Sequence, residues 1–195
     1  IKNIPLVKSA IKSKLPLIIS TGDTNFRDVS RVFKLIPKKS YNKTAFLHCV
    51  SEYPNSIKNI NLNMINFLKK KFNKVSIGFS DHSMGTDMAL AAVAGGASII
   101  EKHITLSKKF VGPDHFFALE SKELYELVKK IRNFENAFGL YEKRRLKDEN
   151  TIYVSLVAKN NLSKNTKIKL NDIVCKRTLK KGIETHNIKK ILKKK

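Results

Sequence analysis

The sequence predicts an α/β fold built around a parallel sheet, because short apolar runs alternate with amphipathic segments of helical period. Each run is about as long as a buried strand, and strands that are covered on both faces are typically continuous apolar runs. Strand and helix alternation at this spacing indicates βα units. The predicted strands are residues 17–19, 45–50, 75–79 and 98–100.

Apolar side chains recur at helical spacing between and after these strands. The last predicted helix starts at Ser121, which is a good N-cap residue, and ends near Gly139. Gly95 and Gly96 indicate another helix stop. The predicted helices are residues 26–36, 57–72, 86–93 and 121–139.

The pattern changes after residue 140, which predicts a second domain. Residues 141–150 are charged and lack an apolar period, so we interpret them as a linker. From about Thr151 onward, short β-like runs are broken by Asn, Ser and Lys, which predicts a small β-rich domain over residues 151–195. Its tail, IKKILKKK, is expected to be a solvated or frayed end.

The charge is unusual, with Lys+Arg 39 against Asp+Glu 16 and a formal net charge of +23. Such a balance can indicate a nucleic-acid or polyanion binder. The excess is mostly Lys spread along the chain, and no aromatic-Gly signature of RNA recognition accompanies it. We therefore interpret it as a compositional bias, with attraction of anionic substrates as a secondary effect, and expect no nucleic-acid partner.

No apolar stretch approaches the roughly 20 residues that cross a membrane, so we expect no membrane partner. Cys49 and Cys175 lie far apart and in no metal-type spacing. They are expected to be free thiols of a cytoplasmic protein.

Polar residues follow each predicted strand, at the edge where parallel α/β folds place their active sites. His82 and His103 end adjacent strands and could hold a divalent metal, with Asp81 and Glu101 as further ligands or anchors. A hydrogen-bonded histidine pair without a metal is the equal alternative. The strand-end segments are Ser20-Thr21-Gly22, HCVSEYP, Ser80-Asp81-His82 and Glu101-Lys102-His103.

Hydroxyl groups at the same edge could hold a phosphate or a carboxylate, although serines are also common at strand ends. His48 is expected to lie in the core or behind the site, and Asp114 and His115 belong to a turn that either faces the pocket or is a mere loop. The candidate hydroxyl residues are Ser20, Ser51 and Ser80.

The ordered motifs STG, HCVSEYP, GFSDHSMG, IIEKHIT and GPDH resemble the sialic acid synthase (N-acetylneuraminate synthase) family, which includes legionaminic acid synthases. SLVAKNNL and VCKR resemble the SAF, or antifreeze-like, domain that ends these enzymes. The resemblance implies an α/β fold that is the C-terminal half of a (β/α)8 TIM barrel, over residues 1–140, followed by an incomplete SAF domain. It also implies an N-terminally truncated chain that is inactive alone.

The activity implied by the resemblance is the condensation of phosphoenolpyruvate with an N-acetylated hexosamine such as N-acetylmannosamine, with release of phosphate. His82 and His103 would bind the metal, which would be Mn2+ or else Mg2+ or Co2+, and Glu101 would lie close to the reacting atoms. Tyr53 and Asp114 would contact the sugar. The three serines Ser20, Ser51 and Ser80 would lie against phosphoenolpyruvate.

Arg177, in VCKR, matches the arginine that the C-terminal domain lends to the sugar site of a partner subunit, so the resemblance implies a domain-swapped homodimer. Departures from the family pattern, such as Asp23 in place of Met and Phe116 after the GPDH motif, leave the sugar open. A legionaminic or pseudaminic acid precursor is the first alternative. The others are a non-catalytic, basic polyanion-binding fragment and a remnant of a once-active gene.

Overall fold

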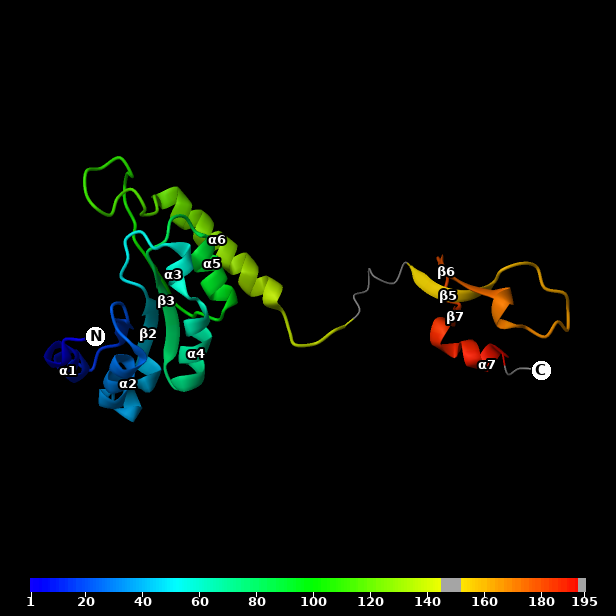
Figure 1. Cartoon of the computed structure of the whole chain (residues 1–195), viewed down its shortest axis with the longest axis horizontal. Coiled ribbons are helices and arrows are strands. Elements are labelled where there is room, and N and C mark those ends of the chain that lie inside the picture. Colours follow the sequence, from blue (N-terminus) through cyan, green and yellow to red (C-terminus); the bar gives the residue numbers. More distant parts are fainter. Residues whose placement is uncertain (145–151, 193–195) are drawn as a thin grey trace. The chain divides into compact units, whose positions relative to one another are not determined.

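The computed structural model describes residues 1–144 and 152–192, which fall into two compact units, Ile1–Gly139 and Leu140–Lys195 (Figure 1). The first unit contains a parallel sheet with the strand order β1-β2-β3-β4, which confirms the predicted α/β class. Its strands and helices are α1 (Ile4–Lys12), β1 (Leu17–Ser20), α2 (Phe26–Leu35), β2 (Thr44–Cys49), α3 (Ile57–Ile60), α4 (Asn63–Lys71), β3 (Ser76–Asp81), α5 (Asp87–Ala94), β4 (Ile100–Lys102) and α6 (Ser121–Phe138).

The core lies between the sheet and the helices that pack on one of its faces. Phe46 of β2 and Phe79 of β3 are fully buried there, together with Ile65 of α4 and Val32 of α2. Helices α4 and α5 pack against β3, and α6 packs against α5 (Figure 1). Because these helices fix the outer face, the strands present their alternate residues to the opposite face, where the polar strand ends lie.

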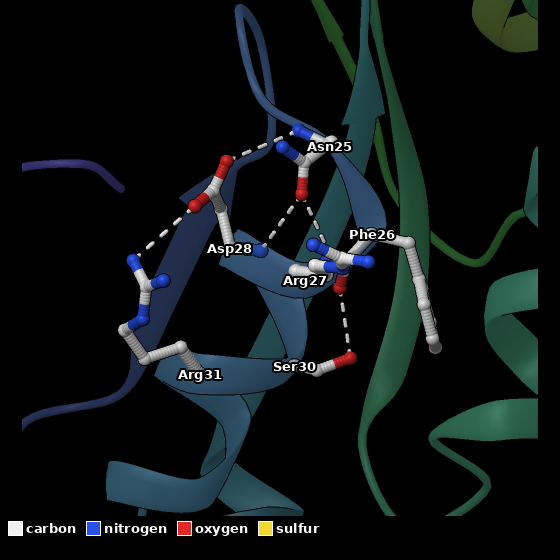
Figure 2. Close-up of polar contacts among 6 residues, drawn as sticks. All are labelled: Asn25, Phe26, Arg27, Asp28, Ser30 and Arg31. Carbon is white, nitrogen blue, oxygen red and sulfur yellow. Dashed lines mark hydrogen bonds and ion pairs between the residues drawn. The ribbon is translucent and has the colours of Figure 1, made fainter.

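The hydrogen bonds at the start of α2 fix the loop that leaves β1. The Asn25 side chain accepts hydrogen bonds from the backbone N–H groups of Arg27 and Asp28, at 2.8 and 3.2 Å (Figure 2). The Asp28 carboxylate accepts in turn from the Asn25 backbone at 3.3 Å and pairs with Arg31. This capping box satisfies N–H groups that would otherwise be free to bind an anion.

Three predicted boundaries are wrong. The predicted helix 57–72 is divided into α3 and α4, because Asn61 between them has a left-handed backbone. The fourth strand begins at Ile100 instead of Ser98, because Ser98 and Ile99 each make a single backbone hydrogen bond to β3 and the paired register starts at Ile100. Helix α6 is capped by Glu120 instead of Ser121, with the Glu123 carboxylate accepting from the Glu120 backbone N–H.

The second unit contains β5 (Tyr153–Ala158), β6 (Ile173–Thr178), β7 (Ile183–Glu184) and α7 (Ile188–Leu192). Its strands pair antiparallel in the order β6-β5-β7. The predicted frayed tail is wrong for α7, whose isoleucines Ile188 and Ile191 lie three positions apart and are half-buried. Most of the predicted linker and the predicted start at Thr151 lie outside the described residues, and the SAF assignment stays a prediction.

No helix among residues 1–144 and 152–192 is long and apolar enough to cross a membrane. In the same residues, Cys49 and Cys175 are free thiols, as expected.

Candidate active site at the ends of β3 and β4

A row of polar side chains crosses one face of the sheet near the carboxyl ends of the strands. Ser80 of β3 is paired in register with Cys49 of β2 and with Glu101 of β4, so the three side chains point to the same side. The buried Ser80 hydroxyl donates a hydrogen bond to Oε1 of Glu101 at 2.7 Å. The structure therefore brings a carboxylate and a hydroxyl together where two neighbouring strands end.

The two candidate histidines lie just beyond this row, on the same side of the sheet. The ring centroids of His82 and His103 are 5.3 Å apart. Tyr53 stacks on the ring of His82 with 4.1 Å between centroids, and the buried Phe117 packs edge-on against His103 at 5.1 Å. Aromatic side chains therefore flank both imidazoles, and the two histidines lie close together, as a shared metal site would require.

The tautomer of His82 follows from its contact with a backbone carbonyl. Its Nδ1 lies 2.9 Å from the carbonyl oxygen of Val50, and because a carbonyl can only accept, Nδ1 must carry the proton. In the neutral ring the other nitrogen, Nε2, therefore keeps its lone pair. This is the usual arrangement of a metal-ligating histidine, whose second nitrogen donates to a carbonyl or carboxylate.

Burial opposes the protonation of His82, but hydrogen bonds to Cys49 and Val50 and the charges of Cys49 and Asp81 outweigh it and raise its pKa. The pKa of the Cys49 thiol is shifted in the opposite direction. Burial opposes its ionisation, yet hydrogen bonds from His82, Ser20 and Ser80 lower its pKa. The Sγ atom of Cys49 and Nδ1 of His82 are 4.0 Å apart. Each residue therefore favours the charged form of the other, a negative Cys49 and a positive His82.

Asp81 is not a ligand candidate, which corrects one of the roles considered for it. Its side chain is fully buried on the other face of the sheet, where Oδ2 pairs with Lys102 at 2.9 Å. Among the described residues, no group of three or more His, Cys, Asp or Glu side chains converges in a way that could hold a metal ion. The imidazoles of His82 and His103 therefore stay the candidate metal ligands at this edge of the sheet.

The loop after β2 brings Tyr53 to the histidines and is held by Asn55. The Asn55 side-chain amide donates to the carbonyl oxygens of Val50 and Glu52, at 3.1 and 2.8 Å. Its backbone N–H donates to the carbonyl oxygen of His82 at 2.9 Å. Burial and the charge of Cys49 raise the pKa of Tyr53, so its hydroxyl stays protonated. Sequence reasoning missed Asn55, because nothing in HCVSEYPN distinguishes it from an ordinary loop residue.

Of the two residues considered in the turn after β4, Asp114 and His115, only Asp114 is placed beside a candidate histidine. An Asp114 carboxylate oxygen lies 3.9 Å from Nε2 of His103, so Asp114 does border the site. His115 instead contacts the Thr105 hydroxyl through Nδ1 at 2.8 Å. His48 lies behind the site, as expected, with Nε2 2.6 Å from the carbonyl oxygen of Ile60, and burial lowers its pKa.

The β1 side of the site is formed by Ser20, the last residue of that strand, and by the close approach of two loops. Gly22 is packed so tightly that an added Cβ would clash with the Ser51 hydroxyl and lie 3.0 Å from the Cys49 sulfur. Ser51 itself is exposed. Arg177 lies in β6 of the second unit, where it is exposed and paired in register with Val154.

Cys49 is the second site residue that sequence reasoning missed, since it was considered only as a free thiol. The signal was available in strand parity. Leu47 and Cys49 share one face of β2, and the parallel register places that face beside Ser80. His48, between them, points to the other face.

Comparison with known proteins places this geometry in a family. A model of the NeuB family matches residues 1–143. The N,N'-diacetyllegionaminic acid synthase of Campylobacter jejuni is 38% identical over 170 residues, covering 84% of this chain and 51% of that protein. The N-acetylneuraminate-9-phosphate synthase of Homo sapiens is 33% identical over 197 residues, covering 99% of this chain and 55% of that protein.

Among solved structures, the sialic acid synthetase of Leptospira borgpetersenii matches with a TM-score of 0.69 and 36% identity, over 76% of this chain and 51% of that one. The chain spans about half the length of the curated relatives it matches. The family match contains the whole parallel sheet and every candidate site residue of the first unit. The chain therefore belongs to the NeuB family.

Proposed function

We propose that this chain is part of a synthase that condenses phosphoenolpyruvate with an open-chain N-acetylated hexosamine to give a nonulosonic acid and phosphate. The carrying observation is the opposed pair His82 and His103, which lies beside the Ser80–Glu101 contact at the ends of adjacent parallel strands. Membership of the NeuB family supports the reaction class, since the matched relatives are named as synthases of such acids.

His82 and His103 would hold a divalent metal, and the fixed Nδ1–H tautomer of His82 fits that role. Imidazole ligands completed by oxygen donors suit Mn2+, with Mg2+ or Co2+ as alternatives. When bound, the ion would supply Lewis acidity toward the aldehyde of the sugar.

The reaction forms a bond between carbon 3 of phosphoenolpyruvate and the aldehyde carbon, while the aldehyde oxygen gains a proton. Water then adds at carbon 2, loses a proton, and the carbon–oxygen bond to phosphate breaks. Glu101 is the proposed acceptor of the water proton, because Ser80 occupies only one of its two carboxylate oxygens. A carboxylate within reach of the reacting water is the general-base arrangement that such a step needs.

The substrate contacts are proposed from the position of each group. Hydroxyls of Ser20, Ser51 and Ser80 would bind phosphoenolpyruvate. Tyr53 and Asp114, which border the two histidines, would contact the sugar. Arg177 would reach the N-acetyl group from the SAF domain of a partner subunit in a domain-swapped homodimer, and the remaining barrel strands of the relatives would complete the site.

The test is phosphate release from phosphoenolpyruvate by the protein made from its full reading frame. It would be assayed with Mn2+ and precursors of neuraminic, legionaminic and pseudaminic acids. Release that needs both a sugar and the metal, and is lost in His82→Ala, supports the proposal and names the acceptor. A folded, metal-loaded protein that releases phosphate with none of these sugars would overturn it.

A further inference from the structure

A buried ion pair joins β3 to β4 on the face opposite the candidate site. Nζ of Lys102 lies 2.9 Å from Oδ2 of Asp81, and their side chains are 3% and 0% exposed. Each residue directly precedes one of the two histidines in the sequence, Asp81 before His82 and Lys102 before His103. The pair therefore spans the two strands at the point where both imidazoles leave the sheet.

The same two side chains also form hydrogen bonds with the backbone of Ser83, the residue after His82. Oδ1 of Asp81 accepts from the backbone N–H of Ser83 at 2.8 Å, and the Lys102 ammonium donates to the Ser83 carbonyl oxygen. Residues 81 and 83 are thus tied to each other and to β4, with His82 between them. This network limits how the peptide planes that carry His82 can rotate.

Stability alone is a poor reason for such a pair. Desolvating two charges offsets most of their attraction, and well-packed apolar side chains of similar size often serve a core equally well. The neighbouring positions on this face, such as Ile77, Phe79 and Ile100, are apolar and pack the core. Directed hydrogen bonds, unlike apolar contacts, fix the separation and rotation of the two strand ends.

We propose that Asp81 and Lys102 are a positioning pair, which sets the separation and orientation of His82 and His103 and thereby the affinity for a divalent cation. This inference rests on the proposed function for its ligand, but it assigns a role to residues on the opposite face of the sheet. Neither residue touches the metal or the substrate. They act through the backbone of the two strand ends.

The test uses the full-length protein and the double variant Asp81→Leu/Lys102→Met, which replaces the pair by apolar side chains of similar size. Removal of groups that orient metal ligands typically lowers metal affinity by about 10–100-fold. We expect a loss of this size in Mn2+ affinity, measured by electron paramagnetic resonance, with a melting temperature close to that of the parent. The single variant Lys102→Met, which leaves the buried Asp81 carboxylate without its ion-pair partner, is expected to have a much lower melting temperature.

Lys108→Met is the matched control, because Lys108 also pairs with a carboxylate, Glu123, but this pair is partly exposed and joins the loop after β4 to α6 instead of joining β3 to β4. It is expected to leave Mn2+ affinity unchanged. The nitrogen chemical shifts of the His82 ring provide a second readout without metal. We expect the parent to show the Nδ1–H tautomer alone and the double variant to show a mixture.

A folded double variant with parental Mn2+ affinity and parental tautomer would overturn the positioning role. If the parent bound no Mn2+ while the double variant still changed the His82 tautomer, the metal assignment would fail and the positioning role would stand. Loss of Mn2+ affinity in Lys108→Met as well would show a general charge effect and would also overturn the proposal.

Discussion

The two inner strands of the sheet and the two outer strands differ sharply in how they are covered. Every residue of β2 is buried, and β3 is buried after its first residue, whereas no residue of β1 or β4 is buried as a whole, although the side chain of Lys102 is. The candidate site spans this difference, since His82 follows an inner strand and His103 an outer one. One imidazole therefore follows a strand that is buried in the core, and the other follows a strand that is less covered.

The largest expected effect contrasts core positions in the two kinds of strand. In the 195-residue chain, Phe79→Ala on β3 should lower the free energy of unfolding by about 3–5 kcal/mol, because the side chain is fully buried. Ile18→Ala on β1, 59% exposed, should cost less than about 1 kcal/mol. Urea denaturation measures both. A similar loss at the two positions would show that something covers β1 in solution.

The next effect separates the two histidines from the others. His82→Ala and His103→Ala should each lower kcat/KM in the full-length protein by about 100-fold or more, since removing a ligand exceeds the usual loss for an orienting group. His186→Ala, a change at an exposed histidine of the second unit, is the control and should have little effect. Equal rates in all three variants would break the link between the strand ends and the chemistry.

A smaller effect is expected from pH. Metal ligation needs neutral imidazole, and the pKa of His82 is raised by its bonds to Cys49 and Val50, so protons compete with the metal at a higher pH than for an ordinary histidine. Mn2+ affinity should fall by about tenfold per unit once the pH is below that pKa. Cys49→Ser should move the fall to lower pH. Titration calorimetry across pH would measure the Mn2+ affinity of both proteins. A decrease at the same pH in Cys49→Ser and in the parent would contradict the prediction.

The smallest expected effect lies on the surface, at the pair of Lys108 and Glu123. The ammonium lies 2.6 Å from the carboxylate and lowers its pKa, so the pair stabilises at neutral pH and the contribution is lost as the pH falls through that pKa. Because both side chains are more than a third exposed, Lys108→Met should cost only about 0.5 kcal/mol at pH 7. Denaturation at pH 7 and pH 3 should show the difference at pH 7 alone.

The sequence predicted the inner strands better than the outer ones, for a physical reason. A strand covered on both faces is a continuous apolar run, so 45–50 and 75–79 match β2 and β3 closely. The run 98–100 was placed two residues too early, because Ser98 and Ile99 each make one backbone hydrogen bond to β3 but the paired register begins only at Ile100. Local backbone geometry, as at Asn61, leaves no apolar signal at all.

The site divides in the same way. Strand ends carrying Ser80, His82, Glu101 and His103 could be placed together because parallel strands end at one edge. Pairing of Asp81 with Lys102 could not be foreseen, since Asp81 was expected at the metal site and charged side chains such as that of Lys102 are seldom fully buried. The role of Asn55 depends on three backbone carbonyls, which no sequence pattern encodes.

The tight contact at Gly22 limits which substitutions the β1 side of the site can accept. Gly22 and Ser51 lie so close that a Cβ at position 22 would clash with the Ser51 hydroxyl, so no side chain can be added at Gly22 without moving Ser51, a proposed phosphoenolpyruvate-binding residue. The loop after β4 is different, because the side chains of Val111 and Phe116 are exposed there. A library of substitutions over residues 110–116 would therefore leave the contact between Gly22 and Ser51 intact.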